Sequence, residues 1–199
     1  MNIAIFASGN GSNFQAIAEA VKEGRIKAKL VLLVCDKPGA YVLERAKKFG
    51  IEQFLIEKKN FSDKKEYESQ ILKKLKEKNI GLIVLAGYMK IIGLDILKAY
   101  KDKIINIHPA LLPSFKGTEG IKEAFDYGVK VTGVTIHFVD EEMDSGPIIM
   151  QEAVEIQSND TQETLSKNIH KVENRIYPEV IGLFVEGKLK IAGRKVIKT

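Results

Sequence analysis

The sequence predicts an α/β fold, a doubly wound and mostly parallel sheet with helices on both faces. Short, continuous apolar runs of the kind found in buried parallel strands occur along the chain. They alternate with segments in which apolar residues recur at helical spacing. The first apolar run ends at a glycine-rich turn that leads straight into such a segment. Because parallel strands need crossover connections, this alternation implies a parallel sheet covered by helices.

The expected strands and helices follow one another in a regular order. Strands are expected at residues 3–7, 30–35, 53–56, 82–86, 104–107, 131–139 and 148–154. Helices are expected from residue 12, at 41–49, from residue 63, at 121–127 and from residue 160. Three polar pairs spaced three apart indicate capped helix starts: Ser12 with Gln15, Asp63 with Glu66, and Asp160 with Glu163. Pro178 is expected to kink or restart the last helix, because its nitrogen carries no hydrogen to donate.

The chain length suits one domain, residues 1–199. Its character changes after residue 108, because residues 109–120 are rich in proline, glycine and serine and are typical of a long loop. We therefore expect a first part, 1–108, with the glycine-rich turn. The second part, 109–199, should hold loops, the later strands and a long C-terminal helix. No linker or internal repeat divides the two.

Composition and charge exclude several classes of protein. Hydrophobic residues make up 45% of the chain and charged residues 29%, so disorder is a poor interpretation. The single cysteine, Cys35, excludes an intramolecular disulfide. No apolar run reaches membrane-spanning length, and the N-terminus is typical of a first strand rather than a signal peptide. We expect a cytoplasmic protein with no membrane or nucleic-acid partner. The net charge of +5 favours anionic small molecules instead.

The first candidate site is the turn at residues 8–13, between the first strand and the first helix. Free backbone N–H groups at a helix N-terminus attract anions, and glycines let the backbone approach a phosphate. The turn is not a Walker loop, and Phe14 occupies the third glycine position of a dinucleotide fingerprint. A phosphate site and a simple tight turn therefore remain equally good interpretations.

The second candidate site follows the strand at 104–107. Ligands bind at the carboxyl ends of strands in an open parallel sheet. Asn106 and His108 point to the same side of an extended chain, because side chains alternate. An amide donor and an imidazole facing one spot suit acyl transfer, in which the imidazole handles a proton and the amide stabilises an oxyanion. A histidine satisfied in a polar turn is the alternative.

The third candidate site is the acidic loop at residues 140–147. Asp144 could orient and charge-stabilise a catalytic histidine, although a solvated acidic turn explains the same residues. His137 is more often a structural hydrogen-bonder than a catalyst. His170 and Glu173 are neighbours on one helix, because they are three residues apart. The histidines are too scattered to indicate zinc, and we expect no metal site.

Four ordered motifs together resemble one family. Residues 106–117 read NIHPALLPSFKG, and a second motif reads GVTIHFV at 133–139 followed by MDSGPII at 143–149. The turn SGNGSN at 8–13 and the stretch LAGYMKII at 85–92 narrow the match. The chain resembles the folate-dependent formyltransferases over nearly its whole length.

The resemblance implies a fold, a reaction and two small-molecule substrates. The fold would be formyltransferase-like and related to the Rossmann fold. A formyl group would pass from 10-formyltetrahydrofolate, a co-substrate, to the amine of glycinamide ribonucleotide in de novo purine biosynthesis. No metal would take part, and the protein would be a monomer or homodimer.

The resemblance also implies roles for individual residues. The catalytic residues would be Asn106, His108 and Asp144. The ribonucleotide contacts would be Gly11, Ser12 and Asn13 at the phosphate, with Pro109 and Glu173 at the ribose. The folate contacts would be Lys64, Met89, Lys90, Ile91, Ile92, Asn106, Val139, Asp140 and Glu141. In the implied mechanism Asn106 and a protonated His108 stabilise the tetrahedral oxyanion, and Asp144 supports the charge on His108.

Three alternatives compete with this interpretation. A formyltetrahydrofolate deformylase uses water as acceptor but typically carries an extra N-terminal domain, and a methionyl-tRNA formyltransferase typically carries an extra C-terminal one. This chain is expected to have neither. A dinucleotide-binding oxidoreductase is the reading from another class, in which Asp36 would bind a ribose. That reading leaves Asn106, His108 and Asp144 unexplained.

Overall fold

The computed structural model describes residues 1–199, which form two compact units at residues 1–105 and 106–199. The predicted division into 1–108 and 109–199 lies close to this boundary, and the assignment of one domain to 1–199 stays a prediction. Strand β5 (Ile104–His108) begins in the first unit and ends in the second. Each unit is described by itself.

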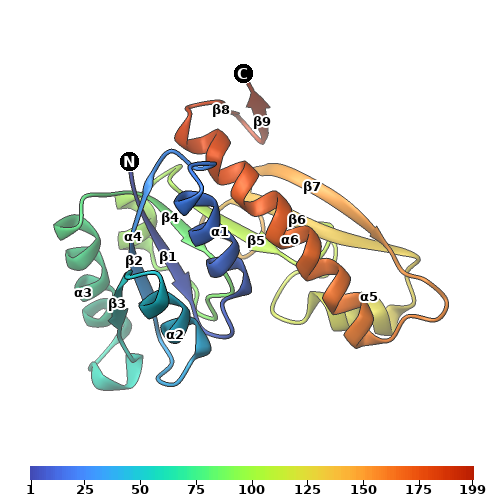
Figure 1. Ribbon diagram of the computed structural model, residues 1–199, viewed down its shortest axis with the longest axis horizontal. Helices are drawn as coiled ribbons and strands as arrows, with labels where there is room; N and C mark the ends of the chain where they lie inside the picture. The colour runs from blue at the N-terminus through green and yellow to red at the C-terminus, as the bar shows by residue number, and fades with distance from the viewer. The chain divides into compact units, whose positions relative to one another are not determined.

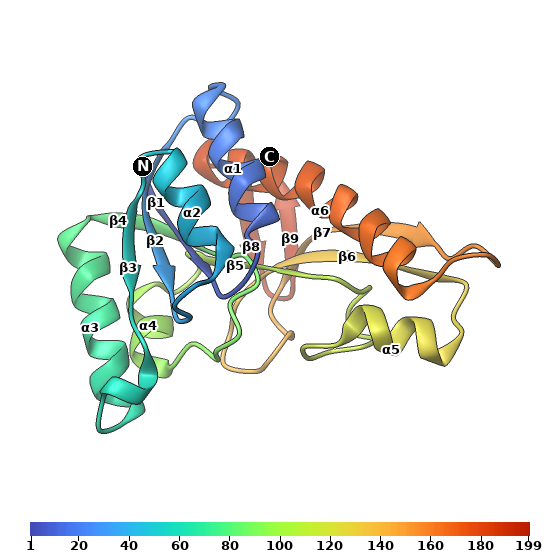
Figure 2. The same cartoon turned by 60° about the horizontal axis from the view of Figure 1, so that its bottom comes forward.

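The first unit is a parallel sheet with helices on both faces (Figure 1). Its elements are β1 (Asn2–Ala7), α1 (Ser12–Lys22), β2 (Lys29–Cys35), α2 (Tyr41–Lys48), β3 (Glu52–Leu55), the 3-10 turn η1 (Lys58–Asn60), α3 (Lys64–Glu77), β4 (Ile80–Leu85) and α4 (Leu94–Ala99). The strand order is β3-β2-β1-β4, and each neighbouring pair is parallel. Helix α1 packs beside α2, and α3 packs beside α4. The two pairs lie on opposite faces (Figures 1 and 2).

The inner strands of this unit are unbroken apolar runs in the sequence because they lie in its core. In β1 every residue from Ile3 to Ala7 is fully buried, because helices cover both faces of the strand. From α1, Phe14 and Ile17 are fully buried at helical spacing. The carboxyl ends of β1, β2 and β4 then fall at one edge of the sheet, which carries the turn at residues 8–13.

The second unit holds antiparallel strand pairs and the longest helix. Its further elements are α5 (Gly120–Tyr127), β6 (Val131–Phe138), β7 (Ile148–Glu155), α6 (Gln162–Val185), β8 (Leu189–Ala192) and β9 (Lys195–Lys198). β6 pairs antiparallel with β7, β8 pairs antiparallel with β9, and β7 meets β9 in parallel. Helix α6 packs along β6 and β7 and contacts α5 near its own start (Figure 1).

Several sequence expectations need correction. Helix α1 begins at Ser12 as expected, but its N-cap is Gly11 and no side chain caps it, so the Ser12–Gln15 capping box is wrong. The amide of Gln15 instead donates to Glu19 one turn on. The Asp63 cap is confirmed by its bond from the Glu66 N–H.

The long helix also differs from expectation. Its N-cap is Thr161 and its capping box uses Thr164, so the Asp160–Glu163 assignment is one residue early. Asp160 instead accepts bonds from the Thr164 hydroxyl and the Gln157 N–H. The helix does not restart at Pro178, because buried residues on both sides of the proline hold it in one piece. The sequence reasoning missed α4, the 3-10 turn and the hairpin β8–β9.

Candidate active site

The end of β5 carries two polar side chains that the apolar strand positions. Asn106 and His108 lie two residues apart on this strand, so their side chains share one side, as predicted. His108 is only 3% exposed, yet both of its ring nitrogens face oxygen atoms. Its Nε2 donates to the carbonyl of Phe115 over 2.7 Å. Its Nδ1 lies 3.6 Å from Oδ2 of Asp144. Asp144 thus places a carboxylate beside Nδ1, where it would stabilise a positive charge on the ring.

His137 completes this cluster from the neighbouring strand β6. The Nδ2 of Asn106 donates to His137 Nε2 over 3.1 Å, and His137 Nδ1 donates to the Phe138 carbonyl over 2.8 Å. This arrangement requires a neutral His137 ring, with its hydrogen on Nδ1. Burial agrees, because removal from water lowers the pKa of His137 below its ordinary value. Asn106 uses one of its two amide hydrogens here, and the second stays available.

Asp144 faces both histidines from the loop after β6. Its Oδ1 lies 3.7 Å from His137 Nε2, and its Oδ2 accepts the backbone N–H of Gly117 over 2.9 Å. The residue has a positive φ of 51°, a conformation that aspartate tolerates better than most residues. The predicted folate contacts Val139, Asp140 and Glu141 precede it in the same loop.

A threonine and a glutamine hold the loop after β5. The hydroxyl of Thr135 on β6 donates to the Ala110 carbonyl and accepts the Leu112 N–H. The side chain of Gln151 on β7 donates to that hydroxyl and to the Leu112 carbonyl. These bonds fix the start of the segment that brings the Phe115 carbonyl to His108. The sequence reasoning missed both residues; Thr135 is a buried polar residue within an apolar strand, whereas Gln151 is exposed and carries no such signal.

A second acid–base pair lies on α6. His170 Nδ1 donates to Glu173 Oε2 over 2.8 Å, and Glu173 is almost fully buried. The hydrogen bond to this carboxylate raises the pKa of His170 above its ordinary value. The structure therefore confirms that the two residues are neighbours, as their spacing predicted.

The turn at residues 8–13 is shaped by one glycine. Gly11 has a φ of 80°, and a Cβ added there would lie 2.5 Å from Cγ2 of Val42. The turn therefore requires glycine at this position. Arg45 on α2 donates to the backbone carbonyl and the side-chain oxygen of Asn10. This cation beside the turn was not predicted, although its place in a basic helix could have suggested it.

The segment after β4 presents apolar side chains to solvent. Met89 is 51% exposed and Ile91 is 67% exposed, whereas Ile92 is buried. The hydroxyl of Ser8 accepts the N–H of Met89 over 2.9 Å. Lys90 lies 3.8 Å from the buried carboxylate of Asp36.

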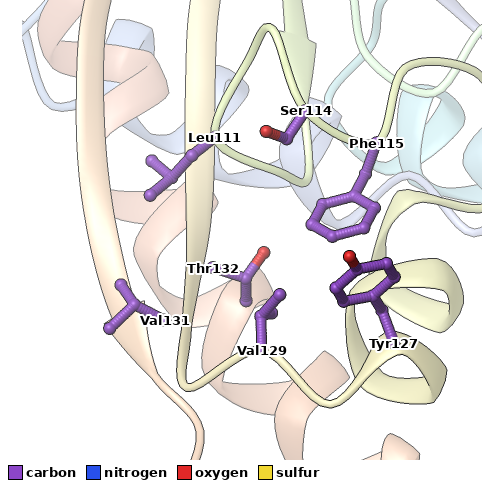
Figure 3. Close-up of a pocket in the computed structure, with 7 residues that line it drawn as sticks. All are labelled: Leu111, Ser114, Phe115, Tyr127, Val129, Val131 and Thr132. Carbon is purple, nitrogen blue, oxygen red and sulfur yellow. The ribbon is translucent and has the colours of Figure 1, made fainter.

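A separate pocket of about 450 Å³ is lined partly by the loop after β5 (Figure 3). It is lined by Leu111, Ser114, Phe115, Tyr127, Val129, Val131 and Thr132. The rings of Phe115 and Tyr127 meet edge to face, with 6.0 Å between their centroids. None of the three predicted catalytic residues lines it.

The structure thus brings together some of the predicted residues. Asn106, His108 and Asp144 form one cluster, with His137 in addition. Gly11, Ser12 and Asn13 form the turn at the start of α1. No group of three or more histidine, cysteine, aspartate or glutamate side chains could hold a metal ion. No helix combines the length and the apolar character needed to cross a membrane.

Comparison with known proteins defines the class. The model of the Formyl transferase family matches residues 1–181, and the chain belongs to this family. Its fold is also that of solved members. The chain superimposes on glycinamide ribonucleotide transformylase 1 from Symbiobacterium toebii with a TM-score of 0.97. The two are 40% identical, and the match covers 100% of this chain and 93% of the other. The predicted mostly parallel α/β fold is thereby confirmed.

Three further proteins are similar to this chain, two phosphoribosylglycinamide formyltransferases and one deformylase. Phosphoribosylglycinamide formyltransferase from Bacillus subtilis is 53% identical over 178 residues, which cover 89% of this chain and 91% of that protein. The phosphoribosylglycinamide formyltransferase structure from Bacillus halodurans is 48% identical, with a TM-score of 0.91 over 93% of this chain and 95% of that one. A formyltetrahydrofolate deformylase from Pseudomonas syringae is 22% identical and shares the fold.

Proposed function

We propose that this protein transfers the formyl group of 10-formyltetrahydrofolate to the amine of glycinamide ribonucleotide, a step of de novo purine biosynthesis. One observation carries the proposal: Asn106, His108 and Asp144 converge at the end of β5, in a chain 53% identical to a phosphoribosylglycinamide formyltransferase. An amide that donates to an oxyanion and an imidazole that handles a proton suit the transfer of an acyl group.

In the proposed reaction the substrate amine attacks the formyl carbon and a new C–N bond forms. The carbonyl oxygen becomes an oxyanion, which the free amide hydrogen of Asn106 and the protonated ring of His108 stabilise. Asp144 stabilises the positive charge on that ring. The bond from carbon to the folate nitrogen then breaks. The amine loses one proton and the folate nitrogen gains one, so the reaction is balanced without metal or oxidant.

His137 orients Asn106 in this mechanism. Because neutral His137 accepts one amide hydrogen, the Asn106 side chain is fixed with its second hydrogen free. The Nε2 hydrogen of His108 is held by the Phe115 carbonyl. Substrate must displace or share that bond, which gives the loop at 114–118 a part in substrate entry.

We assign the substrate contacts as the resemblance implies. Gly11, Ser12 and Asn13 would hold the ribonucleotide phosphate on backbone N–H groups at the start of α1. Glu173, with Pro109 nearby, would hold the ribose. The folate contacts would be Lys64, Met89, Lys90, Ile91, Ile92, Asn106, Val139, Asp140 and Glu141. The exposed apolar side chains at 89 and 91 suit a flat ring system. The protein would act in the cytoplasm as a monomer or homodimer, with no nucleic acid.

The oxidoreductase alternative fits the structure poorly. Asp36 is buried and lies against Lys90, so its carboxylate is not presented to a ribose. Phe14 is fully buried in the core at the third glycine position. Neither feature suits a pyrophosphate at this turn.

To test this proposal, the protein is mixed with both substrates without added metal, and the release of deformylated folate is measured optically. A parallel sample lacks the ribonucleotide. We expect turnover only with both substrates, and none in His108→Ala. Equal turnover without the ribonucleotide would indicate a hydrolase and contradict the proposal.

A further inference from the structure

A buried carboxylate on α3 contacts Lys64, a proposed folate contact, and the backbone of Gly93, which directly follows the proposed contacts at 89–92. Glu68 is 7% exposed. Its Oε1 accepts the backbone N–H of Gly93 over 2.8 Å, at the end of the segment that contains Met89 and Ile91. The same oxygen lies 3.5 Å from the ammonium of Lys64, one turn earlier on the helix. One side chain therefore joins the cation to the backbone of the apolar segment.

The backbone at Gly93 is shaped to this contact. A Cβ added there would lie 1.9 Å from Oε2 and 2.6 Å from Cδ of Glu68. The carboxylate thus rests directly on the main chain, in space that only glycine leaves open. Its position relative to the segment is fixed by sterics as well as by the hydrogen bond.

Other contacts do not replace Glu68. Ser8 holds the N–H of Met89, the hydroxyls of Tyr67 and Tyr88 meet at 2.6 Å, and Lys90 pairs with Asp36. All of these anchor the first half of the segment.

In the other half of the segment Ile92 is buried, and Glu68 provides the side-chain contact that joins the Gly93 N–H to Lys64. The other carboxylates of α3 serve the helix itself, since Glu66 caps its start and Glu77 pairs with Lys74. A carboxylate out of water is costly unless it is paired and hydrogen-bonded. The two partners of Glu68 supply that compensation.

We propose that Glu68 is a positioning residue for formyl-folate, which sets the place of the Lys64 ammonium relative to the Met89–Gly93 backbone. The inference rests on the proposed function. A folate carries a flat ring system and an anionic glutamate tail. The exposed apolar side chains offer a surface for the former and Lys64 a charge for the latter. Glu68 holds Lys64 and the Met89–Gly93 backbone in one arrangement before the folate binds. These protein groups then lose less conformational entropy on binding.

The test compares Glu68→Ala with Glu68→Gln. Alanine removes both contacts, whereas glutamine keeps an oxygen for the Gly93 N–H and loses the charge toward Lys64. We expect Glu68→Ala to raise KM for 10-formyltetrahydrofolate about tenfold, the ratio typical of a lost hydrogen bond to a charged acceptor. Glu68→Gln should stay within about threefold. KM for the ribonucleotide should change by less than about twofold, and kcat by less than about threefold, in both.

Two further measurements separate positioning from a general loss of stability. Amide hydrogen exchange at Gly93 should accelerate in Glu68→Ala and stay near wild type in Glu68→Gln. Glu77→Ala, on the exposed face of the same helix, is the matched control and should leave both KM values unchanged. If Glu68→Ala does not fold, a double-mutant cycle of Glu68→Gln and Lys64→Ala takes its place. The inference requires that the effects of the two substitutions on the KM for 10-formyltetrahydrofolate are non-additive in the double variant.

The outcomes are distinct. Unchanged folate KM in Glu68→Ala, equal increases in both KM values, or additive effects of Glu68→Gln and Lys64→Ala would overturn the inference. The proposed function fails separately, through absence of wild-type turnover with both substrates. Wild-type turnover beside an unaffected Glu68→Ala would refute the positioning role alone.

Discussion

Asn106 shows how the surroundings of one side chain define what it can do. One amide hydrogen is held by a neutral His137, which fixes the direction of the other. We expect Asn106→Ala to lower kcat by about 10²–10³, the cost typical of one lost oxyanion donor. Steady-state kinetics at saturating substrate measure this. Asn159→Ala, in an exposed turn, is the control, and a kcat within about twofold of wild type in Asn106→Ala would refute the assigned role.

His170 makes a second prediction that concerns pH. Its hydrogen bond to Glu173 raises its folded-state pKa, so the bound proton stabilises the folded protein fully below the unfolded value of about 6.5. The contribution disappears as the pH rises through the folded-state pKa. His170→Gln should therefore lower the free energy of unfolding more at about pH 6 than at about pH 9. Urea denaturation at each pH tests this, and an equal loss at both would argue against the ion pair.

His137 has a pH effect on stability opposite to that of His170. Burial lowers its folded-state pKa, so the unfolded chain takes up a proton first as the pH falls below about 6.5. The contribution of His137 to the free energy of unfolding should therefore decrease as the pH falls. Comparison of His170→Gln with wild type at the same pH removes this term, because both proteins contain His137.

The turn before α1 is defined by backbone geometry. Gly11→Ala would place its Cβ against Val42 at a positive φ, and we expect a loss of about 1–3 kcal/mol in the free energy of unfolding. Gly9→Ala, in the same turn, meets no atom within 4 Å and should cost less than about 1 kcal/mol. Thermal or urea denaturation of the pair distinguishes them. Equal stability of the two variants would show that the turn tolerates a side chain at 11.

The long helix α6 depends on its first turn. The hydroxyl of Thr161 accepts the N–H of Thr164, and the hydroxyl of Thr164 accepts the N–H of Thr161. Thr161→Ala should cost about 1 kcal/mol of stability. Ser158→Ala, in the exposed turn before the helix, is the control. A Thr161→Ala protein as stable as this control would indicate that packing alone fixes the helix start.

The elements also show what the sequence could predict. Strand alternation placed Asn106 and His108 on one side of β5, and helical spacing placed His170 beside Glu173. Capping was less predictable, because Ser12–Gln15 and Asp160–Glu163 match the pattern while the backbone begins its helical turn elsewhere. Thr135 and Gln151 could not be assigned, since their bonds to the loop after β5 depend on tertiary contacts.

At the level of the whole chain, the fold followed from its buried strands. Apolar runs such as those of β1 and β2 are continuous because both faces are covered. The hairpin β8–β9 was missed because its strands are four residues long and mostly exposed, so they leave almost no apolar pattern. The reaction itself could be proposed only from four motifs taken together, since each one alone also fits a structural role.

The fate of the formyl carbon tests the central claim most directly. The protein would be given both substrates, with the formyl carbon of 10-formyltetrahydrofolate isotopically labelled, and the ribonucleotide would then be analysed by mass spectrometry. We predict that the label appears on the ribonucleotide amine in step with release of the folate, and that His108→Ala and Asp144→Ala abolish both. Label released as formate, with the ribonucleotide unchanged, would contradict the account.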